Sequence, residues 1–334
     1  MKKKTITVED LSIGYITKRS RKIVAEHIQA DIFSGELTCL LGSNGIGKST
    51  LLRTLSAFQP KLAGSIHLLG KEISEYSEKE LARLVSVVLT EKTSILNMTA
   101  YELISLGRSP YTDFWGTLAE DDRAIIDRII SLIKIENLAP RMVNTLSDGE
   151  RQKVMISKAL VQEAPIILLD EPTAFLDFPS KVEIMQLLHR LSREVNKTIF
   201  LSTHDLELAL QIVDKIWLID KDTRLHIGTP EDLALSGVLS NFFAQKGIIF
   251  DMETGLFRVA NRFNREIRVT GHGRKYAMVR KALLRNEILA SRNAETPSYI
   301  DVGDLHSPIL IGQNGQETRV STIEELLDRI EDFL

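Results

Sequence analysis

A glycine-rich segment between Gly42 and Thr50 constrains the fold of this chain more than any other feature. It reads Gly-Ser-Asn-Gly-Ile-Gly-Lys-Ser-Thr and fits G-x-x-x-x-G-K-[ST], the pattern of a phosphate-binding loop. The apolar run 37–41 before it has strand character, and leucines after it recur at helical spacing. Because the motif needs a strand before it and a helix after it, this context predicts a nucleotide-binding α/β fold rather than a simple glycine turn.

Each part of this segment has its own expected role toward a bound triphosphate. The glycines allow a tight turn whose amides converge on an anion, and the helix that follows adds its unsatisfied N–H groups. Lys48 supplies a charge for the β- and γ-phosphates, and the Ser49 hydroxyl is placed to ligate Mg²⁺. The predicted ATP-binding residues of the loop are Gly42, Ser43, Asn44, Gly45, Ile46, Gly47, Lys48, Ser49 and Thr50.

The bulk composition describes an ordinary globular protein. The 334 residues suit two domains, or one large domain with an appendage, and the 43% hydrophobic fraction is enough for a real core. A net charge of −3 argues against nucleic acid as the main partner. Cys39 is the only cysteine, which excludes an internal disulfide and a cysteine cluster for zinc.

The N-terminus and the hydropathy pattern carry no signal for secretion or membrane insertion. The lysines at positions 2–4 run into a charged, strand-like segment rather than into the apolar region of a secretory signal. No stretch approaches the ~20 apolar residues of a membrane-spanning helix. We therefore expect a soluble, intracellular chain that contacts a membrane only through a partner.

Hydrophobic periodicity predicts the layout of residues 1–259. The first part, to about residue 70, alternates like strands, and residues 78–164 are mostly helical, with an amphipathic helix at 124–133. The predicted turns include Gly14, and the predicted buried parallel strands are 166–169, 198–202 and 216–219. This pattern indicates a phosphate-loop α/β core with a β-rich N-terminal part and a helical insert.

Residues 260–334 are predicted to form a small α+β extension of unknown role. The pattern indicates strands at 267–269, 299–302 and 309–311, a helix at 275–289, and a last helix opened by a Ser321/Glu324 capping box. Nine basic residues between positions 262 and 292 stand against two acids. That excess is typical of a solvated face, and the alternative is a basic surface for acidic headgroups, a permease loop or nucleic acid.

An apolar strand that ends in two adjacent acids supplies the expected catalytic groups. Four branched aliphatic residues, 166–169, come directly before Asp170 and Glu171. A buried strand that delivers an Asp beside a phosphate loop completes the Mg²⁺ shell in such ATPases. Asp170 is therefore the predicted metal ligand together with Ser49, and Glu171 is positioned to polarise the water that attacks the γ-phosphate.

The segment 146–153 reads Leu-Ser-Asp-Gly-Glu-Arg-Gln-Lys, in which Ser147 and Glu150 form a capping box that opens a helix. Together with the phosphate loop and the two acids, it resembles the Leu-Ser-Gly-Gly-Gln signature of the ATP-binding cassette (ABC) ATPases. Further family motifs follow in the expected order between residues 5 and 230. The resemblance implies that Tyr15 stacks on adenine, that Asp177 belongs to the D-loop, and that His204 is the switch histidine.

In this family two cassettes close head-to-tail over two ATP molecules, so the signature helix of one subunit faces the phosphate loop of the other. The resemblance implies that Ser147, the Gly149 amide and Glu150 contact the nucleotide bound by a second chain. A chain with one copy of each motif needs a second cassette to complete a site, and a homodimer is expected. With Glu171 and His204 as the catalytic groups, we expect an active ATPase.

Three positions depart from the family pattern. Asp148 stands where Gly is usual and Glu150 where Gln is usual. A carboxylate near a triphosphate is repulsive unless it points away or pairs with a base such as Arg151 or Lys153. Glu91 takes the expected Q-loop position, where it can accept a hydrogen bond from Mg²⁺-bound water, and we include it in the predicted metal site.

The segment 97–111 resembles the stretch Val-x-Glu-Leu-Val-x-x-Gly-Arg-x-Pro of importer ATPases that serve iron–siderophore, haem and cobalamin permeases. In that family this segment touches the membrane partner. The resemblance implies an ATPase subunit at the cytoplasmic face of the inner membrane, bound to permease subunits and served indirectly by a substrate-binding protein. The sequence does not select among the three cargoes.

The alternative is a soluble ABC ATPase outside transport, of which the cluster-assembly type remains open. Translation-type members usually carry two cassettes, and repair-type members carry long coiled coils or zinc motifs, none of which this sequence contains. A cluster-assembly cassette is not expected to contain the Gly107-Arg108-x-Pro110 segment. An ordinary amphipathic helix ending at Gly107 is the simplest other explanation of that segment.

Overall fold

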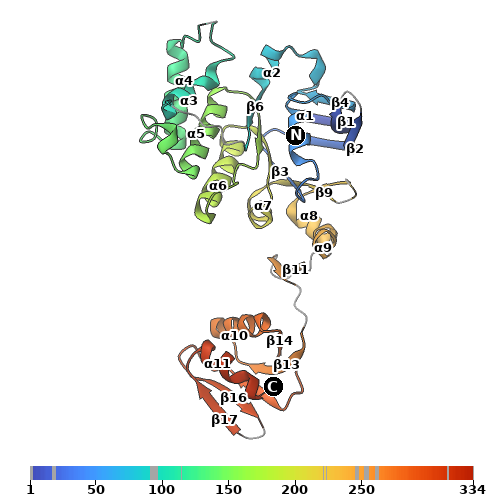
Figure 1. Cartoon of the computed structure of the whole chain (residues 1–334), viewed down its shortest axis with the longest axis vertical. Coiled ribbons are helices and arrows are strands. Elements are labelled where there is room, and N and C mark those ends of the chain that lie inside the picture. Colours follow the sequence, from blue (N-terminus) through green and yellow to red (C-terminus); the bar gives the residue numbers. More distant parts are fainter. Residues whose placement is uncertain are drawn as a thin grey trace. The chain divides into compact units, whose positions relative to one another are not determined.

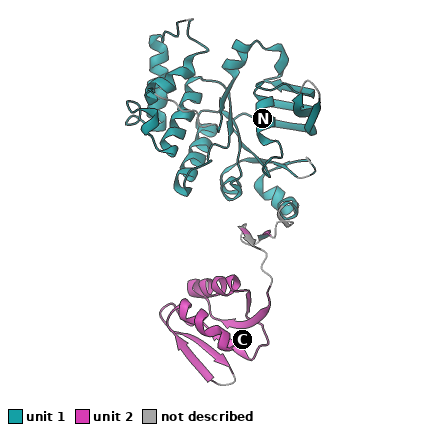
Figure 2. Cartoon of the chain, viewed as in Figure 1, with its two compact units in different colours: residues 1–243, 250–256 teal, residues 244–249, 257–334 magenta. Residues whose placement is uncertain are grey.

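The computed structural model describes residues 3–16, 20–90, 97–113, 115–220, 222, 224–244, 248–251, 256–259, 263–313 and 316–333. The chain divides into two compact units, one of residues 1–243 with 250–256 and one of residues 244–249 with 257–334 (Figure 2). The division predicted at residue 259 stays a prediction, because the hairpin of β11 (Ile248–Asp251) and β12 (Leu256–Val259) is shared between the units.

A six-stranded sheet forms the centre of the first unit, where Figure 1 labels its strands β3, β6 and β9. The strand order is β10-β9-β3-β8-β7-β6. Its strands are β3 (Leu37–Gly42), β6 (Val85–Val88), β7 (Ile166–Asp170), β8 (Thr198–Ser202), β9 (Lys215–Ile219) and β10 (Leu225–Gly228). All pairs are parallel except β9 with β10. The three predicted parallel strands are confirmed as β7, β8 and β9, whose continuous apolar runs reflect burial on both faces.

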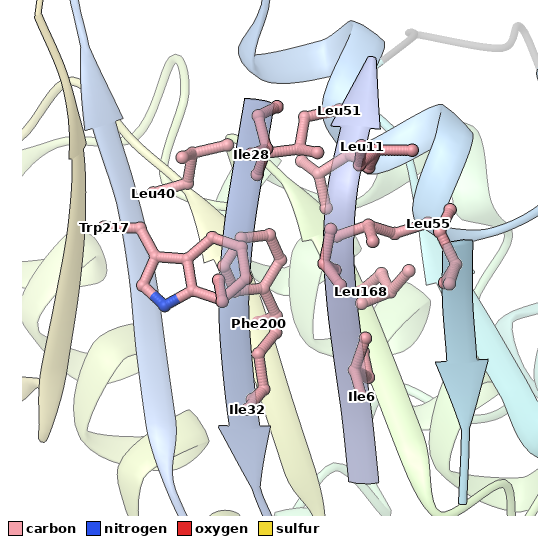
Figure 3. Packing of buried hydrophobic residues seen from close by; sticks show 14 of the residues in the cluster. Ile6, Leu11, Ile28, Ile32, Leu40, Leu51, Leu55, Leu168, Phe200 and Trp217 are labelled. Carbon is pink, nitrogen blue, oxygen red and sulfur yellow. The ribbon is translucent and has the colours of Figure 1, made fainter. Parts of the chain in front are cut away.

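A second, antiparallel sheet packs against the first through a shared core. It has the order β2-β1-β4-β5 and consists of β1 (Lys4–Ile16), β2 (Arg21–Phe33), β4 (Ala63–Leu68) and β5 (Lys71–Glu72). Figure 3 shows apolar side chains from this sheet and from α1 (Lys48–Leu55) meeting Phe200 and Trp217 of the central sheet. The two aromatic rings pack edge to face with centroids 4.9 Å apart.

Gly14 lies inside β1, so its prediction as a turn is wrong. A Cβ atom at this position would lie 2.0 Å from the carbonyl oxygen of Lys22 in the neighbouring β2. Glycine therefore serves a close approach of two strands rather than a change of chain direction.

The predicted helical insert at 78–164 contains a strand, β6. β6 lies within this range and pairs with β7, so it belongs to the central sheet, since the short run Val-Ser-Val-Val is rich in β-branched residues. The surrounding helices are α2 (Glu78–Leu84), α3 (Ala100–Ser105), η2 (Leu106–Arg108), α4 (Glu120–Ile133), η3 (Val143–Thr145) and α5 (Asp148–Val161), with η1 (Ile73–Glu75) before them. The predicted helix at 124–133 is confirmed as part of α4.

The rest of the first unit consists of helices between and after the last central strands. These are α6 (Phe178–Glu194), α7 (Leu206–Ile212), α8 (Pro230–Leu235) and α9 (Val238–Ala244). Among the described residues, none of the helices is both long and apolar enough to cross a lipid bilayer.

The second unit is a five-stranded sheet with two helices on one face. Its order is β14-β13-β15-β16-β17, with β13 parallel to β14 and β15 and the remaining pairs antiparallel. The elements are β13 (Arg265–Thr270), α10 (Gly273–Arg285), β14 (Ile288–Ser291), β15 (Ser298–Asp301), β16 (Ile309–Gln313), β17 (Gln316–Val320), α11 (Ile323–Ile330) and η4 (Glu331–Phe333). Both helices share one apolar core with the sheet.

Two sequence predictions in this unit are wrong in detail. The helix predicted to reach residue 289 ends at Arg285, because Glu287 has a φ of 60° and the chain then enters β14. The N-cap predicted at Ser321 lies one residue later. The N-cap of α11 is Thr322, whose hydroxyl accepts a 3.0 Å bond from the Glu325 amide.

Much of the basic cluster in this unit is used within the unit. Arg265 forms a bidentate ion pair with Glu331, and Lys275 donates to the carbonyl oxygens of Val302, Asp304 and Ser307. Three further arginines, 268, 280 and 292, lie over tyrosine rings. Arg262 is outside the described residues. Arg268, Arg292 and four basic residues of α10 are nevertheless exposed, so the basic surface considered from the sequence stays a prediction.

Candidate nucleotide-binding and catalytic site

The phosphate-binding loop lies at the carboxyl end of β3 and leads directly into α1. Gly45 and Gly47 have φ values of 80° and 110°, in the left-handed region that glycine tolerates. A Cβ atom on Gly47, the N-cap of α1, would lie 2.3 Å from the Val24 side chain. The loop therefore requires glycine here, and it leaves the N-terminal amides of α1 directed at the space where an anion binds.

Lys48 and Tyr15 both lie against this loop. The Lys48 side chain is buried, and its Nζ donates to the carbonyl oxygens of Gly42 at 3.0 Å and Ser43 at 3.3 Å. Tyr15, from β1, shares a 2.8 Å hydrogen bond with the hydroxyl of Thr50 in the first turn of α1. The ring predicted to stack on adenine is thus half-exposed beside the loop.

The two predicted acids lie at the end of β7, with β8 between them and the loop. Asp170 is buried, and its Oδ1 accepts a 2.6 Å bond from the Ser202 hydroxyl. Glu171 follows with a φ of 48°, and Nδ1 of His204 lies 3.4 Å from Glu171 Oε2. The structure therefore brings Asp170, Glu171 and His204 together at one edge of the sheet, as carboxyl ends of parallel strands require.

These groups fit a magnesium triphosphate. The glycine turn leaves room for phosphates, the Lys48 ammonium lies over the same loop, and the buried Asp170 carboxylate is the hard oxygen donor that Mg²⁺ prefers. Ser49 is exposed at the start of α1. Glu91, the third residue of the predicted metal site, lies outside the described residues.

The signature segment opens α5 through the predicted capping box. The Ser147 hydroxyl accepts from the Glu150 amide at 3.2 Å, and the Ser147 amide donates to the Glu150 carboxylate at 2.8 Å. The bond from the Ser147 amide, helped by Arg141 at 2.9 Å, lowers the pKa of Glu150 below its usual value.

Arg151 and Lys153, the two bases considered from the sequence as partners of the extra carboxylate, have partners other than Glu150. Arg151 donates to the Val143 carbonyl, and Lys153 forms an ion pair with Glu183 of α6 at 2.6 Å. The partner is Arg141, which lies before the signature in sequence and is brought to it by the fold. This pair draws the Glu150 carboxylate back toward its own chain, which reduces its repulsion toward a triphosphate.

Gly149 and Asp177 meet at the first turn of α6. A Cβ atom on Gly149 would lie 3.1 Å from Ser180 Oγ. Asp177 is the N-cap of α6 and accepts a 3.2 Å bond from the Ser180 amide, and the hydrogen bonds from Ser180 lower the pKa of the Asp177 carboxyl. Gly149 and Lys153 of the signature segment thus contact α6, whereas Lys48 and Asp170 contact the central sheet.

The Gly107-Arg108 pair, expected in a segment that touches a membrane partner, is buried. A Cβ atom on Gly107 would lie 2.2 Å from the Lys158 carbonyl oxygen in α5. Arg108 donates to Asp122 at 2.8 Å and to Glu163 at 3.0 Å, and it covers the Tyr111 ring. These two residues hold η2 against α5, so any partner contact of this segment falls to its exposed neighbours.

Two hydroxyls that sequence reasoning missed lie next to Asp170. Ser202 contacts its carboxylate, and Thr90 Oγ1 donates to its carbonyl oxygen at 2.6 Å. The only sequence signal for Ser202 is its place at the end of a strand just before the switch histidine. Its role becomes visible once β8 is known to neighbour β7.

Comparisons with known proteins agree with this geometry. Residues 25–174 match the family described as ABC transporter, and residues 264–331 match the iron ABC transporter C-terminal domain. An uncharacterised ABC transporter ATP-binding protein of Methanocaldococcus jannaschii is 38% identical over 84% of this chain and 96% of its own length. The chain belongs to the ABC transporter ATP-binding proteins. The predicted family, the phosphate-loop ATPase fold and the ATP-hydrolysing activity are confirmed.

Two further similarities add detail to the ABC assignment. The iron(3+)-hydroxamate import ATP-binding protein FhuC of Bacillus subtilis is 34% identical over 72% of this chain and 87% of its own. The dimeric ABC transporter cassette MJ0796 has a TM-score of 0.56 and 26% identity, and the match covers 64% of this chain and 93% of that cassette. Motifs alone assign no family to the second unit, but its residues 264–331 match a domain found in iron ABC transporters.

Proposed function

We propose that this ABC ATPase powers the import of an iron complex, of the siderophore or haem class, through a separate membrane permease. The observation that carries the proposal is the match of residues 264–331 to the iron ABC transporter C-terminal domain. The 34% identity of the cassette to an iron–hydroxamate import ATPase supports the same cargo class. Cobalamin, the third cargo considered, has no comparable support. A soluble ATPase outside transport is not favoured.

In the proposed reaction the phosphate loop and Lys48 bind the β- and γ-phosphates, and Tyr15 stacks on the base. Ser49 and Asp170 would hold Mg²⁺, which would screen the phosphate charge when bound. Glu171 orients and deprotonates the attacking water. His204, 3.4 Å from the Glu171 carboxylate, holds that carboxylate in position relative to the γ-phosphate. Glu91, at the predicted Q-loop position, would accept a hydrogen bond from water bound to that metal.

The complete site forms between two copies of the chain. One copy contributes the loop, Asp170 and Glu171, and its partner contributes Ser147, the Gly149 amide, Glu150 and the Asp177 segment. The two sets have separate contacts within one chain, with α6 on one side and the central sheet on the other, and the similar cassette MJ0796 is dimeric. Closure over ATP then moves the permease at the cytoplasmic face of the membrane, and an external binding protein delivers the cargo.

A genetic uptake experiment tests this function. A source strain that lacks the gene is complemented with the wild-type chain or with Glu171→Gln, and uptake of ferric hydroxamate, haem iron and cobalamin is measured. We expect loss of uptake for one iron complex, restored by the wild-type chain only. Unimpaired uptake of every iron complex in the deletion strain would contradict the proposal, and loss of cobalamin uptake alone would reassign the cargo.

A further inference from the structure

The last residue of β8, Ser202, places a buried hydroxyl between the two acids of the site. Its side chain is 0% exposed. Its Oγ donates to Asp170 Oδ1 at 2.6 Å and accepts from the Glu171 amide at 3.0 Å. A serine hydroxyl has one proton and two lone pairs, so a single group serves both neighbours at once.

We propose that Ser202 is a positioning residue that couples the orientation of the metal-binding carboxylate to that of the catalytic base. The inference rests on the proposed roles of Asp170 and Glu171 in ATP hydrolysis. Ser202 acts through the two acids, on the Asp170 carboxylate by its proton and on the Glu171 amide by its lone pair.

The backbone conformation of Glu171 is the first observation that supports a positioning role for Ser202. Its φ of 48° lies in the left-handed region, which an L-residue with a long side chain adopts only when its surroundings hold it there. The Glu171 amide has two acceptors, and both belong to Ser202: the carbonyl oxygen at 3.1 Å and the hydroxyl at 3.0 Å. Ser202 therefore maintains the backbone turn that aims the Glu171 carboxylate.

The Asp170 carboxylate gives the second reason. The Ser202 hydroxyl fixes one carboxylate oxygen, and the Thr90 hydroxyl fixes the main-chain carbonyl at 2.6 Å. An aspartate held by its main chain and by one carboxylate oxygen presents its other carboxylate oxygen in a fixed direction, and outer-shell partners of this kind orient the ligands of a metal. The three residues before Ser202 in β8, 199–201, are apolar and buried, and Ser202 is the position of this strand that brings a hydroxyl to the two acids.

The test compares Ser202→Ala with a matched control, Ser192→Ala. Ser192 is also 0% exposed, but its hydroxyl donates to the His189 carbonyl within α6. ATP affinity of the full chain is measured by calorimetry in Mg²⁺ and in EDTA, and turnover is measured in saturating Mg-ATP. We expect Ser202→Ala to weaken Mg-ATP binding and turnover by about 10–100-fold, with metal-free ATP affinity within about twofold of wild type. Ser192→Ala should match wild type in all three measurements.

The Mg²⁺ dependence of affinity separates positioning from a general loss of structure. If Ser202→Ala also lowers the affinity for metal-free ATP, the test is repeated with Ser202→Cys, whose side chain is of similar size and is a weaker hydrogen-bond donor. Ser202→Cys should lose an intermediate amount of affinity, and only for Mg-ATP. Wild-type Mg-ATP affinity and turnover in Ser202→Ala, or an equal loss with and without metal in both variants, would overturn the proposal. Glu171→Gln separates the premises: if it retains full turnover, the assigned base is wrong whatever Ser202 does.

Discussion

Replacement of Arg108 by methionine should destabilise the first unit strongly, because it leaves a buried carboxylate without its cation. The Arg108 and Asp122 side chains are 6% and 9% exposed and 2.8 Å apart. Removal of one partner of a buried ion pair costs about 3–5 kcal/mol. Asp122 retains a 3.0 Å bond from the Ala119 amide, so we place the loss in the free energy of unfolding near the lower limit, at about 3 kcal/mol.

The assay is urea unfolding of the full chain, with the transition of the first unit followed separately because two units need not unfold together. Arg128→Met is the matched control. Arg128 also pairs with Glu163, but its side chain is 66% exposed, and its loss should stay below about 1 kcal/mol. Asp122→Asn completes a double-mutant cycle and should show coupling of about 2 kcal/mol or more. A loss under about 1 kcal/mol for Arg108→Met, with additive double-mutant effects, would refute the reasoning.

Three further predictions use the same structure. Gly107→Ala should lower stability by about 1–3 kcal/mol in the same urea assay, because its Cβ would lie 2.2 Å from the Lys158 carbonyl, and a wild-type midpoint would contradict this. Tyr15→Phe keeps the aromatic ring and should bind Mg-ATP within about twofold of wild type, whereas Tyr15→Ala should bind it at least about tenfold more weakly. Equal affinities of Tyr15→Ala and wild type would show that Tyr15 does not contact the nucleotide. Capping hydrogen bonds lower the pKa of Glu80, Glu102 and Glu150 in the folded chain. These carboxylates therefore stabilise the fold at any pH above their unfolded pKa of 4.5, and they lose this contribution as the pH falls through their lower folded pKa values. In an acid titration followed by circular dichroism, the wild-type chain should lose helix below pH 4.5, and Glu102→Gln should lose less. Identical titration curves for wild type and Glu102→Gln would refute this prediction.

The parts of the fold that the sequence predicts well are those set by local rules. The phosphate loop requires glycine between a strand and a helix, and the four aliphatic residues of β7 have no other environment than a sheet buried on both faces. The capping box at Ser147 is equally local, because the residues that form it are three positions apart. Such features need no knowledge of which strand lies beside which.

The parts that failed depend on partners from distant positions. Arg141 neutralises Glu150 because the loop before α5 folds back on the helix start, which no spacing rule encodes. Ser202 acquires its partners from a strand 32 residues away in sequence. The helix was predicted to extend to residue 289 because leucines at 283, 284 and 289 continue a helical pattern. In the structure the helix ends at Arg285, and Glu287 has a left-handed backbone conformation. The side chains of the site were therefore predictable by type, and their partners were not.

Two copies of this chain should enclose Mg-ATP between the loop of one and the signature of the other. Sedimentation of Glu171→Gln with excess Mg-ATP tests it most directly, since this variant binds ATP and hydrolyses it too slowly to release the closed state. We predict a dimer that retains one nucleotide per chain and that disappears when Ser147→Arg is added. A variant that binds Mg-ATP and remains a monomer, alone and with its permease, would contradict the account.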